Sequence, residues 1–441
     1  MLRPYALPLR LPAALGRAAV GQTGTARVAV VMITAILTVS LQRPMAPTPK
    51  QPNGSPHWAE FGVSVAAVSE TIFVAASPVR NGKRDPGSVY VFQHRSAGWV
   101  RADVLSVPEI AVEDLFGVSM AADGDTLVVG AQFADARGHD SGQAYVFERD
   151  NGRWHQAAVL SASDAAAGDQ FGLTVSVSGE TIVVGARLAD SGAADAGAAY
   201  VFTRDNGTWQ QVRKLIASDA AAGDIFGRVS IDKDLMIVTA DLNDDRGRNA
   251  GKAYAFQNRG GAWVEVAQIT ANDGTAGDEF GVSLALKEST AVFGAVGANG
   301  RSDDSGAAYV FEPRESVWAQ VGRLTANDAA TGDAFGLSVA AGTDTIIVGA
   351  PNHSGAGTHA GAAYVFERRA GVWTQAVKLT ASDAAPVTSF GSTVAISGNT
   401  IVVGMLLNGE GRRSGAAYVF ERRDGGWSEV ARLGPEATAP R

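Results

Sequence analysis

Short apolar runs alternate with polar turns along most of the chain. In residues 171–178 (FGLTVSVS) apolar side chains alternate with small or polar ones, which predicts a half-buried β-strand. Residues 181–186 (TIVVGA) form an unbroken apolar run, which predicts a strand that is buried on both faces. The polar residues between the two runs include Gly179, and glycine supplies the positive φ that tight β-hairpins require. The two runs are therefore expected to pair as a hairpin.

A second hairpin is predicted after a longer loop that is rich in Gly, Asp, Ser and Ala. Its strands are residues 198–204 (AAYVFTR) and 209–215 (WQQVRKL), and Asn206-Gly207 stands between them. Asn-Gly between two alternating runs is a strong hairpin signal. This stretch thus predicts four antiparallel strands, joined by two tight turns and one longer loop.

This unit recurs seven times, and a Phe-Gly pair opens every copy. The pairs follow one another at intervals of 55 residues, with a single interval of 54. They begin at Phe61, Phe116, Phe171, Phe226, Phe280, Phe335 and Phe390. Repeats of this length are typical of propellers and solenoids. Four strands in each of seven copies predict an all-β protein, a seven-bladed β-propeller that spans residues 58–434 and closes into a ring without bare sheet edges.

Each copy also carries a Trp seven residues after the Phe of its Tyr-x-Phe strand, as Trp209 follows Phe202. These aromatic positions recur in every copy, whatever that copy contacts. We therefore expect the Phe and Trp side chains to fill the space between adjacent blades rather than to stack on a ligand.

The amino-acid composition and the motifs of the chain limit the kinds of site that it can form. The chain has no cysteine, which excludes disulfides, thiolate metal sites and cysteine nucleophiles. It also lacks a nucleophile elbow, a Walker loop, an HExxH motif and a zinc cluster, so no catalytic residue is assigned. The net charge of −8 is uneven, because the first 59 residues hold six Arg or Lys and no Asp or Glu. The remaining body is acidic, which argues against nucleic acid as a partner.

The N-terminal region has its own pattern. Four arginines precede an apolar run over residues 28–41, which is short for a membrane-spanning helix and suits a signal-peptide core. Residues 1–42 are interpreted as a signal peptide or an uncleaved N-terminal anchor, with a later start at Met32 as an alternative. Residues 43–57 form a Pro-rich linker and residues 435–441 a tail. We expect a secreted or cell-envelope protein that contacts a membrane only through an uncleaved segment.

The Phe-Gly pair is followed, fourteen residues after the Phe, by Gly-Ala or by the fuller Gly349-Ala350-Pro351. With the Tyr-Val-Phe strand and the Trp, this pattern resembles FG-GAP repeats of the type found in many secreted bacterial proteins, which are related to the propeller of integrin α-chains. The resemblance is loosest at Ala75-Ala76, Ala240-Asp241 and Gly404-Met405. It implies a propeller fold and a role in ligand binding or adhesion.

In the integrin branch, the resemblance implies calcium bound by Asp-x-Asp-x-Asp-Gly loops between the Phe-Gly and Gly-Ala-Pro elements. A two-residue hairpin occupies that interval here, so these calcium sites are not expected and no cofactor is predicted. The nearest approach to such a loop is Asp241, Asn243 and Asp245, whose oxygens fall at alternate positions. Lys252 stands where a bidentate Glu would complete an EF-type loop, so a solvated loop is the preferred interpretation and calcium the alternative.

An acidic connector recurs between the Trp strand and the next Phe-Gly pair, with two aspartates five residues apart. The pairs are Asp164 and Asp169, Asp219 and Asp224, Asp273 and Asp278, and Asp328 and Asp333. One interpretation is that these side chains hydrogen-bond the nearby backbone and shape the turn. The alternative is a ring of ligands for cations or sugars.

In an up-and-down blade, the turns between strands 1–2 and 3–4 lie on one face of the ring, and the 2–3 loops share the other face with the connectors. The variable segments therefore gather on one face, where a rigid scaffold displays a binding surface. We expect a monomeric binding module with a protein or carbohydrate ligand on that face. The alternatives are a propeller hydrolase or lyase that acts on a polysaccharide, and a cation-dependent adhesion protein. Carboxylates deep in the central channel would favour the enzyme, and small residues there would favour binding.

Overall fold

The computed structural model describes residues 61–76, 79–80, 83–84, 86–315, 317–406 and 415–435. The chain divides into Met1–Pro44 and Met45–Arg441, and the described residues all belong to the second unit. The predicted signal segment and linker therefore lie outside the described residues, as does the tail beyond Pro435. The described residues form strands and no helix, so none of them belongs to a helix that could cross a membrane.

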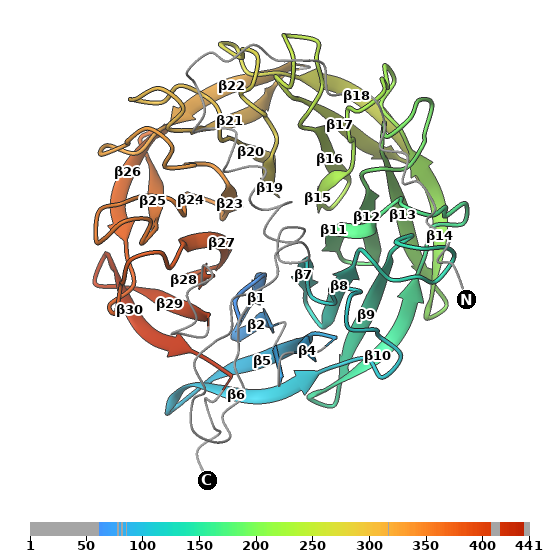
Figure 1. Ribbon diagram of the computed structural model, residues 1–441, viewed down its shortest axis with the longest axis horizontal. Coiled ribbons are helices and arrows are strands. Elements are labelled where there is room, and N and C mark those ends of the chain that lie inside the picture. The colour runs from blue at the N-terminus through green and yellow to red at the C-terminus, as the bar shows by residue number, and fades with distance from the viewer. Residues whose placement is uncertain are drawn as a thin grey trace, which may run out of the picture. The chain divides into compact units, whose positions relative to one another are not determined.

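Seven four-stranded antiparallel sheets stand in a ring (Figure 1). Blade 1 contains β1 (Val65–Val68), β2 (Thr71–Ala76), β5 (Ser88–Arg95) and β6 (Gly98–Leu105). Blade 2 contains β7 (Met120–Asp123), β8 (Thr126–Ala131), β9 (Gln143–Asp150) and β10 (Arg153–Leu160). Blade 3 contains β11 (Phe171–Ser178), β12 (Thr181–Ala186), β13 (Ala198–Asp205) and β14 (Thr208–Leu215). Blade 4 contains β15 (Arg228–Asp232), β16 (Leu235–Ala240), β17 (Lys252–Arg259) and β18 (Ala262–Ile269).

Blade 5 contains β19 (Ser283–Lys287), β20 (Thr290–Ala295), β21 (Ala307–Arg314) and β22 (Val317–Leu324). Blade 6 contains β23 (Ser338–Ala341), β24 (Thr345–Ala350), β25 (Ala362–Arg369) and β26 (Val372–Leu379). Blade 7 contains β27 (Phe390–Ser397), β28 (Thr400–Met405), β29 (Ala416–Arg423) and β30 (Gly426–Leu433). A small hairpin of β3 (Val79–Arg80) and β4 (Lys83–Arg84) lies between β2 and β5. Every blade uses four strands that follow one another along the chain, and the prediction of an all-β, seven-bladed propeller is confirmed.

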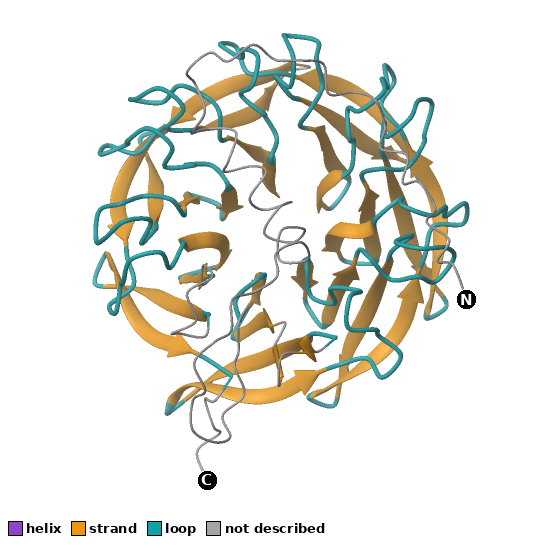
Figure 2. Cartoon of the chain, in the orientation of Figure 1, coloured by secondary structure: helices purple, strands orange, loops and turns teal. Residues whose placement is uncertain are grey.

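Both predicted hairpins are present. Ser178 pairs with Thr181 across a two-residue turn, in which Gly179 has a φ of 54°. Asp205 pairs with Thr208, and Asn206 and Gly207 between them have φ values of 49° and 80°. Positive φ at both central residues is the type I′ geometry that matches the twist of a hairpin. In each blade the first strand lies nearest the axis and the fourth lies outermost, with loops joining them at the two ends (Figure 2).

The hydrophobic core lies between blades. β12 is buried along almost its whole length, as its unbroken apolar sequence predicted. Its Ile182 and Val184 pack in one cluster with Phe171 and with Val146 of the preceding blade. Phe171 also makes an edge-to-face contact with Tyr200, at 5.6 Å between ring centroids. The same Phe–Tyr contact recurs in every blade, so each Phe-Gly pair anchors its blade through an aromatic ring.

The Trp of each copy joins its blade to the preceding one. Trp209 on β14 is 8% exposed, and its Nε1 donates to Glu148 Oε1 of blade 2 at 3.1 Å. Trp154 in turn packs edge to face on Phe73 of blade 1, with centroids 5.1 Å apart. These contacts confirm the expected place of the Trp side chains between blades.

The ring closes with the same contacts that join consecutive blades. Trp99 Nε1 of blade 1 donates to Glu421 Oε1 of blade 7 at 3.1 Å, as Trp209 does to Glu148. Phe61 and Val402 of these two blades share one apolar cluster. Within the described residues, no strand is exchanged between the first and last blades.

Blade 4 departs from the repeat. Arg228 pairs with Thr239, whereas in blade 3 Thr174 pairs with Gly185. Blade 4 thus has one residue fewer directly after its Phe-Gly pair, which explains the interval of 54 residues. Thr239-Ala240 therefore occupies the Gly-Ala position. The sequence assignment of Ala240-Asp241 to that position was wrong by one residue, because the missing residue lies before the hairpin.

Replacement of Trp209 by Ala is expected to lower the free energy of unfolding by about 3–5 kcal/mol, because it leaves a cavity between blades 2 and 3. Val212→Ala is the matched control on the same strand, since Val212 is 50% exposed. The control is expected to change the free energy by less than about 0.5 kcal/mol in the same denaturant titration. A loss below about 1 kcal/mol for Trp209→Ala would show that this side chain is not part of the core between blades.

Candidate binding face

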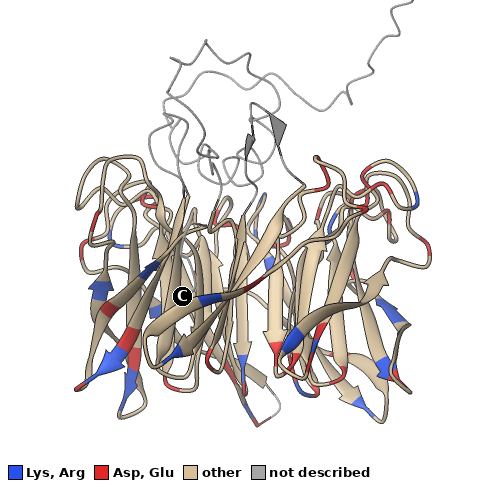
Figure 3. Ribbon diagram, turned by 90° about the horizontal axis from the view of Figure 1, so that it is seen from below, with Lys and Arg blue, Asp and Glu red and all other residues tan. Residues whose placement is uncertain are grey.

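The two faces of the ring differ in their loops. One face carries the loops between the second and third strands together with the connectors between blades, and we call it the loop face (Figure 3). The other carries the tight turns and is called the turn face. Backbone hydrogen bonds join the 2–3 loops of blades 2 to 6 to the following connectors, as Gly168 N donates to His139 O at 2.9 Å and Phe171 N to Ser141 O at 3.0 Å. Loops and connectors therefore form one continuous surface.

The second aspartate of each connector is buried and shapes the turn. Asp169 is 6% exposed, and its Oδ2 accepts a hydrogen bond from Ala166 N at 2.8 Å. Asp224, Asp278 and Asp333 make the equivalent bond to the residue three positions earlier. Burial raises the pKa of Asp169, Asp224 and Asp278, although these backbone bonds oppose the rise. Such contacts agree with the turn-shaping interpretation.

The first aspartate of each connector is paired with a cation. Asp219 accepts a hydrogen bond from Tyr254 OH at 2.7 Å, and Lys252 Nζ lies 2.5 Å from its other oxygen. Burial raises the pKa of Asp219, but the hydrogen bonds from Lys252 and Tyr254 outweigh burial and lower it below its ordinary value. Asp164, Asp273 and Asp328 pair with Lys214, Arg323 and Lys378, at 2.7, 2.9 and 2.8 Å. The predicted carboxylates all lie on the loop face, but a ligand would have to compete with these internal partners.

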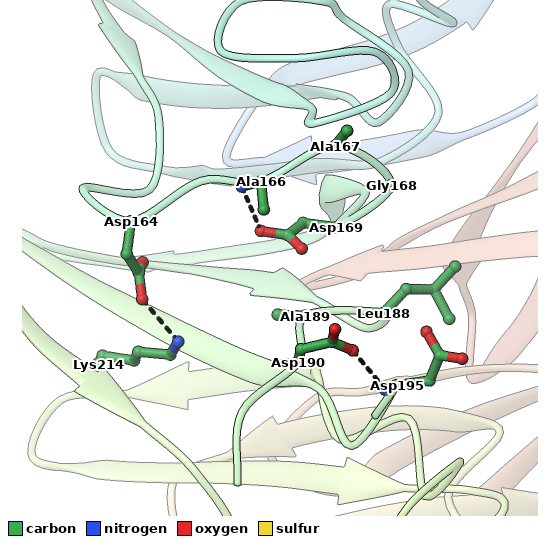
Figure 4. A pocket seen from close by; sticks show the side chains of 10 residues that line it. All are labelled: Asp164, Ala166, Ala167, Gly168, Asp169, Leu188, Ala189, Asp190, Asp195 and Lys214. Atoms are coloured by element: carbon green, nitrogen blue, oxygen red, sulfur yellow. Dashed lines mark hydrogen bonds and ion pairs between the residues drawn. The ribbon is translucent and has the colours of Figure 1, made fainter. Parts of the chain in front are cut away.

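A polar pocket of about 220 Å³ lies between a connector and the 2–3 loop of blade 3 (Figure 4). Four aspartates line it together with Lys214: Asp164, Asp169, Asp190 and Asp195. The ammonium of Lys214 pairs with Asp164, while Asp190 Oδ1 accepts a hydrogen bond from Asp195 N at 2.9 Å. The pocket offers carboxylate oxygens of the kind that bind sugar hydroxyls or hard cations.

The structure also reveals a brace in the 2–3 loops that sequence analysis missed. In five blades, the side chain of one loop residue accepts a hydrogen bond from the backbone N of the residue five positions later. The pairs are Asp135 and Asp140, Asp190 and Asp195, Asp244 and Asn249, Asn299 and Asp304, and Ser354 and His359. The second member always has a positive φ, between 50° and 57°. A polar residue recurring at this loop position was the available sequence signal.

The three weak calcium candidates each have a partner within the protein. Asp241 Oδ1 lies 3.3 Å from Arg228 Nε, and Asp245 Oδ2 lies 2.5 Å from Lys252 Nζ. Asn243 instead holds a connector carboxylate through its side-chain amide. The ammonium of Lys252 therefore engages a carboxylate oxygen that a calcium ion would require.

In the described part of the chain, one group has the composition of a metal site: Asp135, His139 and Asp140, whose ligand atoms lie within 4.8 Å of one another. His139 Nδ1 lies 3.1 Å from Asp140 Oδ2, and Asp135 and His139 are exposed. Asp135 already uses one oxygen in the loop brace. The group thus has an internal structural role.

The central channel is lined by the first strands of the blades. Small and apolar residues predominate in its cavity of about 300 Å³, such as Ala121, Val175 and Ala340. Its described lining includes two carboxylates, Asp123 and Asp232, which accept hydrogen bonds from backbone N atoms of the neighbouring blades.

Four charged residues lie at the loop-face end of the inner strands of blades 3, 4 and 5, and we call them the inner-rim charge cluster. Arg187 follows β12, Arg228 opens β15, Asp241 follows β16, and Glu279 precedes the Phe-Gly pair of blade 5. Their charges interact with one another, and Arg228 and Asp241 form an ion pair at 3.3 Å. Glu279 Oε2 is buried without a hydrogen-bond partner.

Burial, together with the negative charge of Asp241, raises the pKa of Glu279 to about 7, although Arg228 and Arg187 oppose the rise. Burial also lowers the pKa of Arg187, although its guanidinium stays charged at neutral pH. Two arginines and two acidic side chains therefore share this site, and the pKa of one of the acids, Glu279, lies near neutral pH.

Comparison with known proteins agrees with the repeat. A family model described as FG-GAP repeat matches residues 99–147, 154–202, 209–256, 263–311, 318–366 and 373–420. No curated protein matches the chain. Among solved structures, the crystal structure of Chaetomium thermophilum Sqt1 is similar, with 14% sequence identity and a TM-score of 0.47. That match covers 87% of this chain and 88% of the other.

Glu279 is expected to make stability fall as pH rises. Its folded pKa of about 7 exceeds the ordinary value of 4.5, so the folded state retains a proton that the unfolded chain releases. Its contribution is thus fully present below pH 4.5 and is lost as pH rises through about 7. The difference in melting temperature, Glu279→Gln minus wild type, should therefore be more positive at high pH than at low pH.

The exposed Glu180→Gln is the matched control, and its melting temperature should follow that of wild type at every pH. An equal pH dependence for wild type and Glu279→Gln would contradict the assignment.

Proposed function

This chain belongs to the FG-GAP repeat family, and from that premise we propose that it is a binding module that holds a protein or carbohydrate ligand on its loop face. The observation that supports the proposal is a constant loop frame with variable tips. The five braced loops have the same spacing and the same positive φ at their second brace residue. Their sequences differ, as DARGHD over residues 135–140 and SGAGTH over residues 354–359 illustrate. Loops of this kind on a rigid scaffold are typical of recognition surfaces.

The turn face offers far less variety. Its turns contain two residues in most described blades, and several are held to the neighbouring blade, as Gly179 N is held by Asp123 Oδ2 at 2.7 Å. The scaffold beneath the loops is rigid, because apolar clusters join each blade to the next around the described ring. A loop-face ligand would therefore meet a preformed surface, which lowers the entropy cost of binding.

The proposal also places the propeller outside the cytoplasm, because the predicted signal or anchor precedes it. Cells that express the full chain should export it, and cells that express a chain without residues 1–42 should retain it. Fractionation that finds both forms in the cytoplasm would rule out this location.

Four loop-face side chains allow a direct test, because they form no hydrogen bond or ion pair in the described part of the chain and carry no net charge as a set. They are Arg137, Asp195, Arg248 and Asp303. The full chain is screened on an array of glycans and an array of purified proteins. Replacement of all four by Ala should weaken each specific interaction by about tenfold or more, as loss of interface contacts does.

The control is a matched set on the turn face, again with two acids and two bases: Asp150, Glu180, Lys233 and Arg259. Replacement of these by Ala should leave binding unchanged. Each measurement is made with calcium and with EDTA, because the pocket of four aspartates would make cation-dependent adhesion sensitive to chelation. Loss of binding with the turn-face set but not with the loop-face set would place the ligand on the opposite face and refute the proposal.

A further inference from the structure

The inner-rim charge cluster is a departure from the repeat. The positions that correspond to Arg187 hold Gln132, Val296, Pro351 and Leu406 in other described blades. Those that correspond to Glu279 hold Leu115, Gln170, Ile225, Ala334 and Ser389 in other described blades, and the sequence has Glu60 there in blade 1. Most blades therefore form without charge at these places, so a blade does not require these charged side chains for its own packing.

Arg228 replaces a residue with a structural task. In blades 2, 3 and 5 the equivalent Ser119, Thr174 and Ser283 donate a hydrogen bond to the Phe-Gly glycine carbonyl of the next blade. In blade 4, Thr239 makes that bond instead, with Gly281 O at 2.7 Å. The interface bond is thus retained from another strand, and the position beside it holds a guanidinium.

The two arginines keep most of their donors unused. Arg228 bonds Asp241 through Nε, one of five N–H donors of its guanidinium, and no other hydrogen bond of its side chain is found within the described residues. Arg187 has no hydrogen-bond or ion-pair partner in the same part of the chain. A partly buried cation without a partner is costly unless it is paired when the protein acts.

We propose that the inner-rim charge cluster is a carboxylate-binding site, in which Arg187 and Arg228 hold the carboxylate of a protein partner. Planar guanidinium groups bind carboxylates through paired N–H donors, which suits two arginines with unused donors. The site lies at the loop-face end of the inner strands, so a ligand on the loop face can reach it. This inference rests on the proposed function and adds the chemical group that the surface recognises.

The charge of the surrounding loops favours a protein over an acidic polysaccharide. The loops of blades 3, 4 and 5 expose five aspartates, Asp190, Asp195, Asp244, Asp245 and Asp303, against three arginines, Arg246, Arg248 and Arg301. A polymer with a carboxylate on every sugar would be repelled by this excess of negative charge. A peptide that carries one carboxylate next to a lysine places a single negative charge on the arginines and a positive charge toward the aspartates.

The protonation of Glu279 changes the affinity of this site for a carboxylate. In its protonated form it removes a negative charge beside the ligand and supplies an O–H donor. The charged groups that face it are Asp241 after β16, Arg228 on β15 and Arg187 after β12. Affinity for a carboxylate should therefore rise as pH falls through about 7, where Glu279 gains its proton.

The test uses the full chain and two capped tetrapeptides, Gly-Lys-Glu-Gly and Gly-Lys-Gln-Gly, titrated by calorimetry or NMR. The Glu peptide should bind, and the Gln peptide should bind at least about tenfold more weakly, as loss of a charge-assisted contact predicts. Arg187→Gln and Arg228→Gln should each weaken binding of the Glu peptide by about tenfold or more. Arg246→Gln is the matched control, because Arg246 is an exposed loop-face arginine outside the cluster, and it should leave the affinity unchanged.

Two further measurements separate ligand binding from a purely structural role. Arg187→Lys keeps the charge but not the paired donors, and should bind the Glu peptide with intermediate affinity while it melts like wild type. The affinity of wild type should increase from pH 8 to pH 6, and that of Glu279→Gln should stay constant. If the cluster had only a structural role, neither the affinity of Arg187→Lys for the Glu peptide nor the affinity of wild type between pH 8 and pH 6 would change.

Several outcomes would overturn the inference: no binding of the Glu peptide, equal binding of both peptides, or unchanged affinity in Arg187→Gln. Tighter binding of trigalacturonate than of the Glu peptide, with dependence on Arg187, would show that an acidic sugar is the ligand and that the assignment to a protein is wrong. The four loop-face replacements, at Arg137, Asp195, Arg248 and Asp303, leave the inner-rim charge cluster intact. If these replacements do not weaken binding of the ligands found on the arrays, while the Glu peptide still binds, the result would count against the proposed face and not against this site.

Discussion

Two glycines that meet across five of the seven interfaces between blades set the geometry of this propeller, and Ala75 and Thr239 replace the first glycine at the other two. The Gly-Ala glycine of one blade faces the Phe-Gly glycine of the next: a Cβ added to Gly185 would lie 1.7 Å from Gly227 O, and one added to Gly294 would lie 1.9 Å from Gly336 O. No side chain fits at that distance in the interfaces where both residues are glycine. The hydroxyl bond from the first strand to the same carbonyl, as from Ser283 to Gly336 at 2.6 Å, fixes the two blades in register. The two glycines of the motif are therefore partners in space, although they belong to different blades.

This constraint explains why so much of the fold could be predicted from the sequence. Each match of the family model begins at a Trp strand and ends at the Tyr-Val-Phe strand of the next blade, as residues 154–202 do. Each repeat of the sequence therefore contains one complete interface between two blades. The spacing of the repeats thus gives the spacing of these interfaces along the chain. Six matches span the six interfaces between consecutive blades. The seventh, between Gly404 and Gly62, joins the two ends of the array and has no continuous sequence, so its closure without strand exchange could not be read from the period.

The candidate site could be predicted only in part. Asp219 and Asp224 were recognised from their regular spacing, because both belong to a connector whose sequence recurs. Their roles depend on partners far along the chain: Tyr254 lies 35 residues and Lys252 33 residues from Asp219. Sequence spacing carries no information on such pairs until the blade is folded. The inner-rim charge cluster was missed for a related reason, since its residues come from three blades and their combination does not recur in the chain.

The departures from the repeat carry information that the repeat itself does not. At a blade interface, an Arg in place of the hydroxyl residue would leave the glycine carbonyl of the next blade without its donor, at a cost of about 1–3 kcal/mol if that carbonyl stays buried. Blade 4 avoids the cost because Thr239 replaces glycine and supplies the hydroxyl from the second strand. The Thr239 side chain also has to fit where five other blades have glycine, and the loss of one residue after Gly227 accompanies this change. Three linked changes thus preserve the interface and leave Arg228 beside Asp241. A change that restores packing elsewhere while it places Arg228 at the inner rim indicates that this charge has a task, since the six other blades hold Ser or Thr at the same position.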